Sequence, residues 1–193
     1  MKPTIIIDLN SGNLLSLENA LSHEHRPLSR VQQPEAYDFT GDEVLVLPGQ
    51  GRFAFISDRM DKLGWRNFLG DWLTNGGHLV GICVGMQILF EGSAEDPDAR
   101  GLGFFPGRCE RLNHPKTPMV GWAKLDSYKL NMKDQYAYFV NSYGVPDCDN
   151  ATAKVTYGDA FCAAVQKNRV YGFQFHPEKS GRFGRELLQH VCQ

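Results

Sequence analysis

Hydrophobic positions in the first half of the chain fall into short apolar runs separated by segments with helical spacing. The runs that have the length of buried strands are 4–8, 44–47 and 79–83. Segments in which apolar residues recur at helical spacing are 14–21, 53–75 and 84–91, and Gly64 interrupts the second of them. Buried strands that alternate with helices predict an α/β fold with an open, mainly parallel sheet flanked by helices.

The second half of the chain has a different pattern, with brief strand-like runs and turn residues between them. These runs are 108–112, 137–140, 152–157, 162–165 and 171–175. They predict antiparallel hairpins added to the parallel core. We expect residues 92–102 to form a polar, exposed loop, and a last helix to bury Phe183, Leu187 and Val191. No repeat or linker divides the chain, so we predict one domain over residues 1–193.

Composition narrows the range of functions. The net charge of −2 gives no general attraction for nucleic acid or anionic lipid. No apolar run approaches the roughly 20 residues that span a bilayer, and the N-terminal segment lacks a signal-peptide pattern. The five cysteines include no Cys-x-x-Cys pair, so neither a zinc knuckle nor a dithiol redox motif is expected. We therefore predict a cytoplasmic protein with reduced thiols, no metal and no cofactor.

Cys83 lies between a predicted buried strand and a predicted helix, with Gly81 two positions before it and Gly85 two positions after it. This is the arrangement of a nucleophile elbow, in which flanking glycines relieve crowding in a strained turn. The N–H groups at the start of the helix favour a thiolate, and the N–H of Val84 is positioned to donate to an oxyanion. The alternative is a buried core cysteine at the end of a strand.

His176 ends an apolar strand, and Glu178 follows two residues later across Pro177. A cysteine that attacks an amide needs a base, and the imidazole of that base needs a third group to orient it. Alone, the pair could be a loop histidine beside a solvated glutamate. Together with the Cys83 elbow, it predicts a Cys–His–Glu triad. We expect the other histidines to be structural or exposed: His23, His25, His78, His114 and His190.

The loop Pro48-Gly49-Gln50-Gly51 follows the second predicted strand. Strand ends of an open α/β sheet meet at one edge, where such folds bind ligands. We predict that this loop supplies the rest of an oxyanion hole through the N–H of Gln50 or Gly51. In isolation, the loop could equally be a plain turn that ends a strand.

These segments resemble the class I (triad) glutamine amidotransferases, a family with a flavodoxin-like fold. The resemblance is carried by Gly-Ile-Cys-Val-Gly-Met-Gln at 81–87, the Pro-Gly-x-Gly loop and Phe-His-Pro-Glu at 175–178. More narrowly, the chain resembles the glutaminase subunit of imidazole glycerol phosphate synthases. The matching segments are 7–8, 12–14, 16–20, 101–103, 106–107, 121–122, 138–140, 142–143 and 172–181.

The resemblance implies hydrolysis of glutamine to glutamate and ammonia. Cys83 would form a glutamyl thioester, His176 would carry the proton and Glu178 would orient His176. The substrate would be held by residues in three segments: Gly49, Gln87, Ser142 and Tyr143.

The resemblance also implies a (β/α)8 cyclase partner in a heterodimer. The cyclase would join the ammonia to a phosphoribulosyl aminoimidazole intermediate, giving imidazole glycerol phosphate and aminoimidazole carboxamide ribotide for histidine biosynthesis. Residues expected to face the cyclase are Asn13, Met119, Trp122, Tyr138 and Lys179. Trp122 could equally pack in the core, since buried tryptophan is common in both settings.

The chain departs from the family pattern in three places. It has Gln50 where the family has a small or aliphatic residue, Asn141 where the family has histidine, and Pro-Met-Val-Gly-Trp-Ala at 118–123 instead of Pro-His-Met-Gly-Trp-Asn. A paralogue that supplies ammonia for the amidation of surface sugars is therefore an alternative. The glutaminase of pyridoxal phosphate synthesis is another, although residues 12–14 and 121–122 argue against it. A cysteine hydrolase or peptidase and a non-catalytic binding module complete the alternatives.

Overall fold

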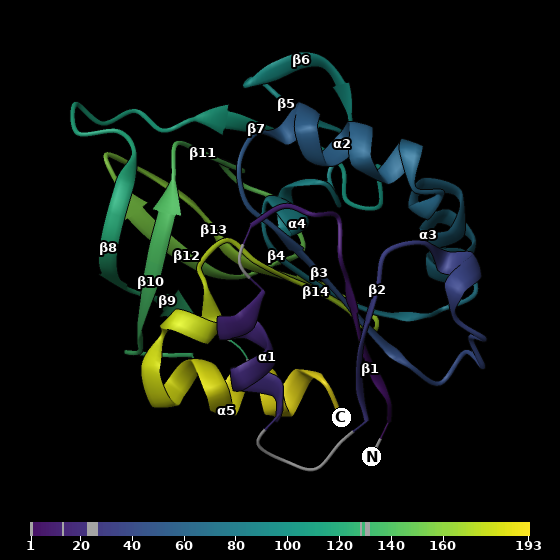
Figure 1. Cartoon of the computed structure of the whole chain (residues 1–193). Helices are drawn as coiled ribbons and strands as arrows, with labels where there is room; N and C mark the ends of the chain where they lie inside the picture. Colours follow the sequence, from purple (N-terminus) through teal and green to yellow (C-terminus); the bar gives the residue numbers. More distant parts are fainter. Residues whose placement is uncertain (1, 13, 23–26, 128, 130–131) are drawn as a thin grey trace.

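The computed structural model describes residues 2–12, 14–22, 27–127, 129 and 132–193. Within these ranges, eight strands form the central sheet (Figure 1). In spatial order they are β2 (Leu28–Val31), β1 (Thr4–Ile7), β3 (Val44–Gly49), β4 (His78–Cys83), β14 (Val170–Phe173), β13 (Asp159–Lys167), β12 (Ala151–Tyr157) and β9 (Asp126–Ser127). Strands β2, β1, β3, β4 and β14 run parallel, and β13, β12 and β9 continue the sheet antiparallel. The predicted mainly parallel sheet with added antiparallel hairpins is confirmed.

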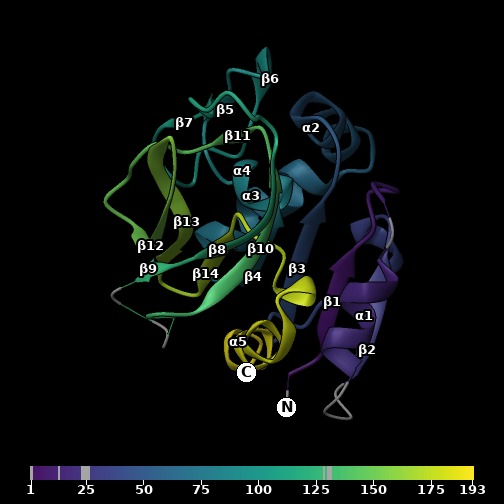
Figure 2. The same cartoon turned by 90° about the vertical axis from the view of Figure 1, so that its left-hand side faces the viewer.

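Helices cover both faces of the parallel half of the sheet (Figures 1 and 2). Helices α1 (Leu15–Leu21) and α5 (Gly181–Val191) pack together on one face. Helices α2 (Phe53–Lys62), α3 (Trp65–Thr74) and the short α4 (Val84–Gln87) lie on the other. Gly64 adopts φ +80° between α2 and α3 and breaks the helical segment where the sequence predicted an interruption. Two 3₁₀ turns, η2 (Pro34–Ala36) and η3 (Pro177–Lys179), complete the helical elements among the described residues.

Two smaller sheets accompany the central sheet. Strands β8 (Met119–Lys124) and β10 (Tyr136–Asn141) form an antiparallel ribbon, and β5 (Gly92–Ser93), β6 (Asp96–Arg100), β7 (Arg108–Arg111) and β11 (Tyr143–Gly144) form the other sheet. The prediction of a loop over 92–102 is wrong, because β5 and β6 pair as a hairpin. β5 is buried, whereas β6 is exposed or half-buried, as expected for a polar segment. Strands β2 and β8 also form, although no apolar pattern predicts a strand at either place. β2 gains its partner only by pairing alongside β1.

The helix predicted over 84–91 ends at Gln87. The next three carbonyls, of Ile88, Leu89 and Phe90, accept hydrogen bonds from the backbone N–H groups of Leu102, Phe105 and Gly103, respectively. Those bonds satisfy the carbonyls without a continuing helix. The segment 84–90 is buried throughout. Its sequence therefore shows no change from apolar to polar positions that could mark the end of the helix.

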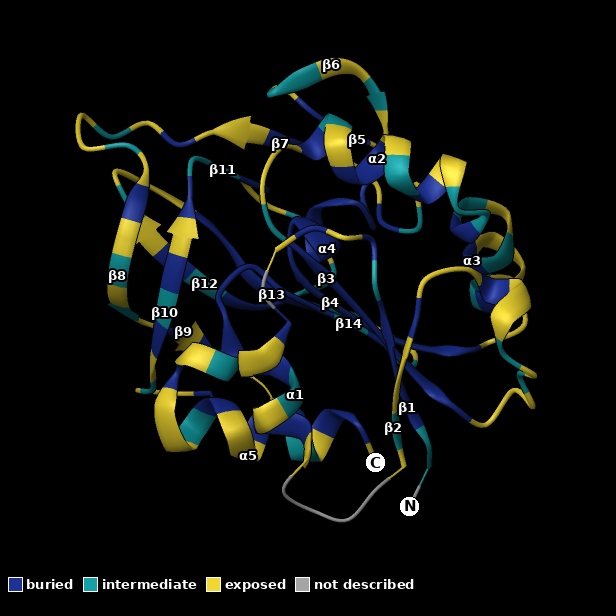
Figure 3. Ribbon diagram, in the orientation of Figure 1, coloured by how far each residue is buried: buried dark blue, intermediate teal, exposed yellow. Residues whose placement is uncertain are grey.

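The core lies on both sides of the central strands β1, β3 and β4, which are buried along their whole length (Figure 3). Leu187 and Val191 of α5 are buried as predicted, and Phe183 is half-buried. Of the histidines expected to be structural or exposed, His78 is buried, and His23 and His25 lie outside the described residues. No helix in the described ranges is long and apolar enough to cross a membrane.

Candidate active site

Cys83 occupies a sharp turn between β4 and α4, at the carboxyl edge of the parallel strands. Its φ is +55°, a left-handed conformation that costs a non-glycine residue free energy and that is held by the surrounding packing. The turn is crowded: a Cβ on Gly85 would lie 1.8 Å from the carbonyl oxygen of Leu47, and one on Gly81 would lie 2.6 Å from the carbonyl oxygen of Gly85. Glycine at both positions therefore allows α4 to pack directly against β3 and β4.

His176 and Glu178 come from the segment that follows β14. Nδ1 of His176 lies 2.8 Å from Oε1 of Glu178, and the two side chains are 5% and 6% exposed. Burial lowers the pKa of His176, but the neighbouring Cys83 sulfur and Glu178 carboxylate outweigh burial and raise the pKa to about 10. The structure therefore places a cationic imidazole beside the candidate nucleophile.

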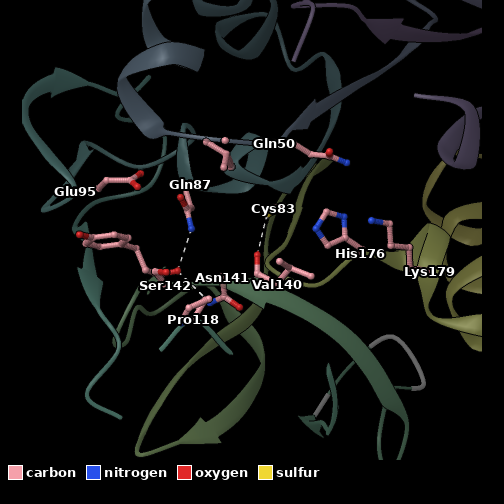
Figure 4. A pocket seen from close by; sticks show the side chains of 13 residues that line it. Gln50, Cys83, Gln87, Glu95, Pro118, Val140, Asn141, Ser142, His176 and Lys179 are labelled. Carbon is pink, nitrogen blue, oxygen red and sulfur yellow. Dashed lines mark hydrogen bonds between the residues drawn. The ribbon is translucent and has the colours of Figure 1, made fainter. Parts of the chain in front are cut away.

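A cavity of about 360 Å³ opens beside Cys83 and His176 (Figure 4). It is lined by Gln50, Gly51, Cys83, Val84, Gln87, Glu95, Pro118, Val140, Asn141, Ser142, Tyr143, His176 and Lys179. A volume of this size suits a small polar molecule. Sequence-predicted residues from four distant segments therefore meet around one hollow. Glu178 lies behind His176 and not in the wall.

The predicted oxyanion loop forms one wall of the cavity. Gln50 and Gly51 line the cavity together with Val84, and Gly51 adopts φ +100°. Gly49 lies behind this wall, where a Cβ would approach the backbone nitrogen of Gly85 to 2.7 Å. The loop and the start of α4 are thus in close contact, and a side chain at position 49 would push them apart.

Gln87 and the backbone of Tyr143 are joined by a buried hydrogen-bond network. Nε2 of Gln87 donates to the carbonyl of Tyr143 at 3.0 Å and to Oε1 of Gln174 at 3.0 Å. Nδ2 of Asn141 donates to the same carbonyl of Tyr143 at 3.0 Å. Asn141 is therefore part of the wall and holds the strand end that leads into Ser142.

Glu95, which no sequence pattern singled out, lines the cavity at the end opposite Lys179 (Figure 4). Its Oε2 accepts a hydrogen bond from the backbone N–H of Phe53 at 2.9 Å, at the start of α2. The Asp96 carboxylate accepts from the next N–H, of Ala54, at 3.0 Å. Acidic residues suit helix N-termini, but nothing in the sequence indicates a helix start more than 40 residues away.

The residues predicted to face a partner do not all share one surface. On the β8–β10 ribbon, the outward face carries the exposed side chains Val120, Trp122, Tyr136 and Val140. We call these four residues, together with the half-buried Tyr138, the ribbon patch. Trp122 is 55% exposed, so the core-packing alternative for it is wrong.

Other residues of the predicted partner set lie elsewhere. Met119 is buried on the inward face of the ribbon. Lys179 is exposed at the rim of the cavity. Asn13 lies outside the described residues. In the part of the chain that the structure describes, no group of three or more His, Cys, Asp or Glu side chains is arranged to hold a metal ion.

Comparison with known proteins gives consistent relatives. The family model for glutamine amidotransferase class-I matches residues 5–192. The chain is 37% identical over 201 residues to a protein of Shouchella clausii named imidazole glycerol phosphate synthase subunit HisH, covering 97% of this chain and 96% of that one. It is also 37% identical over 201 residues to the protein of the same name from Thermococcus kodakarensis, covering 96% of each chain.

Solved structures share the fold. A structure described as glutamine amidotransferase superposes with a TM-score of 0.78 at 19% identity, covering 97% of this chain and 98% of the other. The structure of PurLQS from Thermotoga maritima superposes with a TM-score of 0.74 at 16% identity, covering 99% and 98% of the two chains.

Proposed function

The chain belongs to the class-I glutamine amidotransferase family, and from this membership we propose that it hydrolyses glutamine to glutamate and ammonia in the cavity beside Cys83. The observation that carries the proposal is the cluster of a strained cysteine, a buried histidine with a raised pKa and a buried carboxylate. A nucleophile, a base and an orienting group are what acyl transfer from an amide requires.

In the proposed mechanism, the Cys83 thiolate attacks the side-chain amide carbon of glutamine. The negative charge that develops on the amide oxygen is stabilised by backbone N–H groups of Gln50, Gly51 or Val84, which line the same wall. His176, protonated and held by Glu178, donates its proton to the leaving nitrogen, and ammonia departs. The glutamyl thioester is then hydrolysed by water, for which the now neutral His176 acts as the base.

The other end of the cavity suits the amino-acid end of glutamine. Glu95 supplies a carboxylate there for the α-ammonium group, in charge complementarity with it. Gln87, Ser142 and Tyr143 line the space between Glu95 and Cys83 and are assigned the remaining contacts to the substrate. The side chain of Gln87 is held in place by its hydrogen bond to the backbone carbonyl of Tyr143.

The released ammonia passes to a synthase partner, which we propose is a (β/α)8 cyclase of histidine biosynthesis in a heterodimer with this chain. The full-length relatives are each named as a subunit of imidazole glycerol phosphate synthase, which supports this assignment. The ribbon patch is the proposed contact surface, because exposed aromatic and aliphatic side chains gathered on one face are typical of interfaces. Val140 belongs to the patch and also lines the cavity, so the two sites adjoin.

The proposed reaction is expected in the cytoplasm. The five cysteines carry free thiols, which supports that location because thiols stay reduced there.

The deciding experiment replaces the nucleophile and supplies nitrogen in two forms. Cys83→Ala, assayed with a histidine-pathway cyclase, should abolish turnover with glutamine and leave turnover with ammonium chloride unchanged. Cys148→Ala is the matched control, because Cys148 lies outside the cavity and should leave both activities intact. Glutamine-dependent turnover that survives in Cys83→Ala would contradict the proposed chemistry. The proposed partner would be contradicted by a chain that is an active glutaminase but delivers ammonia to a sugar-amidating synthase and not to a cyclase of histidine biosynthesis.

A further inference from the structure

Gln174 is a wholly buried polar residue that the mechanism above does not use. It directly follows β14, and its exposed fraction is 0%. Its backbone N–H donates to the carbonyl of Ala163 at 2.9 Å, which fixes the main chain beside β13. Its side-chain amide reaches the site: Nε2 lies 3.9 Å from Sγ of Cys83, and Oε1 accepts from Nε2 of Gln87 at 3.0 Å.

The orientation of the Gln174 amide follows from its neighbours. The main-chain carbonyl of Tyr143 can only accept, so Gln87 must present its nitrogen there. That nitrogen carries two hydrogens, and the second points at the side chain of Gln174. Gln174 must therefore present its oxygen to Gln87 and its nitrogen to the sulfur. The backbone carbonyl of Tyr143 thus fixes which end of each side-chain amide, of Gln87 and of Gln174, carries the nitrogen.

Two neutral groups lie close to the Cys83 sulfur and have opposite effects on its protonation. The carbonyl oxygen of Val140, 3.9 Å from Sγ, can only accept and therefore favours the protonated thiol. The Gln174 N–H can only donate and therefore favours the thiolate. The charged groups around the same space are His176 with Glu178 behind it, Glu95 at the far end of the cavity and Lys179 at the rim.

We propose that Gln174 is a positioning residue for the nucleophile: its amide stabilises the Cys83 thiolate and joins it to the substrate-holding Gln87. This inference rests on the proposed glutaminase function, which it deepens. When glutamine binds against Gln87, that side chain and the sulfur are held in one rigid arrangement through Gln174. Loss of the Gln174 N–H donor should therefore destabilise the Cys83 thiolate relative to the thiol. Loss of the Gln174 oxygen should leave the side chain of Gln87 without one of its two hydrogen-bond partners.

The test measures the thiol directly and does not depend on glutamine. The rate of Cys83 alkylation by iodoacetamide is followed from pH 5 to 10 in the full-length chain, with the modified Cys83 peptide quantified by mass spectrometry. Gln174→Glu keeps the acceptor toward Gln87 and places a carboxylate oxygen beside the sulfur. We expect the midpoint of its pH profile to rise by about one unit or more, which corresponds to a roughly tenfold lower alkylation rate below the midpoint. Gln174→Met removes donor and acceptor without adding charge, so a smaller rise in the midpoint and an increased KM for glutamine are expected.

Gln166→Glu is the matched control, because Gln166 lies on the neighbouring strand β13, outside the cavity, and should leave the profile unchanged. If Gln174→Glu does not fold, as judged by thermal unfolding, Gln174→Met decides the question. Folded variants whose alkylation profiles superimpose on that of the unmodified chain would overturn the proposal, even if their glutaminase activity fell. An altered thiol profile in a chain without glutaminase activity would instead leave the role of Gln174 standing and count against the proposed function.

Discussion

The imidazole of His176 is bound through Nδ1 to Oε1 of Glu178 at 2.8 Å, although only Pro177 separates the two residues. The 3₁₀ turn η3 folds the carboxylate back toward the ring. An ionised carboxylate can only accept, so Nδ1 carries the hydrogen and Nε2 remains for proton exchange with the Cys83 sulfur. The second carboxylate oxygen of Glu178 is buried and has no partner in the described ranges, so the acid depends on this one interaction.

Glu178→Gln should therefore damage catalysis far more than folding. The variant keeps its shape but loses the charge that helps to raise the pKa of His176, so that pKa should fall. We expect glutamine-dependent turnover with the partner present to decrease by about 10²–10⁴-fold, the usual contribution of acid–base catalysis. Glu186→Gln is the control, because Glu186 is exposed on α5 and pairs with Arg182. A loss of less than threefold would argue against an orienting role for Glu178.

His78 should make the fold sensitive to acid. Burial is the main cause that lowers its pKa, followed by the charges of Arg169 and Lys2, and the value falls from 6.5 to about 4. Between those values the unfolded chain takes up a proton that the folded chain does not, so the free energy of unfolding decreases as the pH falls through this window. At about 1.36 kcal/mol per pKa unit, the loss amounts to at most about 3 kcal/mol.

Urea unfolding at several pH values from 4 to 7 tests this expectation. His78→Leu should flatten the pH dependence of the unfolding free energy below pH 6.5. His190→Leu, which changes an exposed histidine, should leave the dependence as it is. Equal slopes for the unmodified chain and His78→Leu would show that His78 is not the titrating group.

Trp122→Ala should weaken partner binding by about 30-fold or more, the effect of losing an aromatic anchor worth at least about 2 kcal/mol. Trp122 is 55% exposed in the chain alone, so the substitution should change the unfolding free energy of the chain by less than about 1 kcal/mol. Titration calorimetry with the cyclase, paired with thermal unfolding, separates the two effects. Phe55→Ala is the matched control, because Phe55 is 46% exposed on α2, away from the ribbon patch. Equal affinity of the two variants for the cyclase would remove the ribbon patch from the interface.

Gly85→Ala and Gly70→Ala should have opposite effects on stability. The added methyl group at 85 would lie 1.8 Å from the carbonyl oxygen of Leu47, so α4 must move and the unfolding free energy should drop by about 3 kcal/mol or more. At position 70, inside α3, a Cβ has open space, and alanine should stabilise the helix by about 0.5–1 kcal/mol. Chemical denaturation measures both. A Gly85→Ala chain as stable as the unmodified one would show that the elbow can relax.

Much of the parallel core follows from the sequence alone. The apolar runs at 4–8, 44–47 and 79–83 become β1, β3 and β4, because a strand buried on both faces has a nearly continuous hydrophobic sequence. The segment 53–75 becomes two helices separated at Gly64. The glycines around Cys83 predict the sharp turn, since a close approach of backbone to backbone requires them. Local patterns suffice for these features because the constraint acts on neighbouring residues.

Other features were decided only when distant segments came together. Helix α4 ends at Gln87 because the N–H groups of Leu102, Gly103 and Phe105 bind the next three carbonyls, and no local signal marks that end. The hairpin that brings Glu95 to the cavity depends on pairing with β7, and its sequence reads as an exposed loop.

Side-chain environments at the site and on its rim were decided in the same way. The pairing of β8 with β10 turns Trp122 outward and Met119 inward. Gln174 reaches Cys83 although 91 residues separate them along the chain. Periodicity reports which positions avoid water, whereas the partner of a buried amide or carboxylate depends on where a remote strand ends.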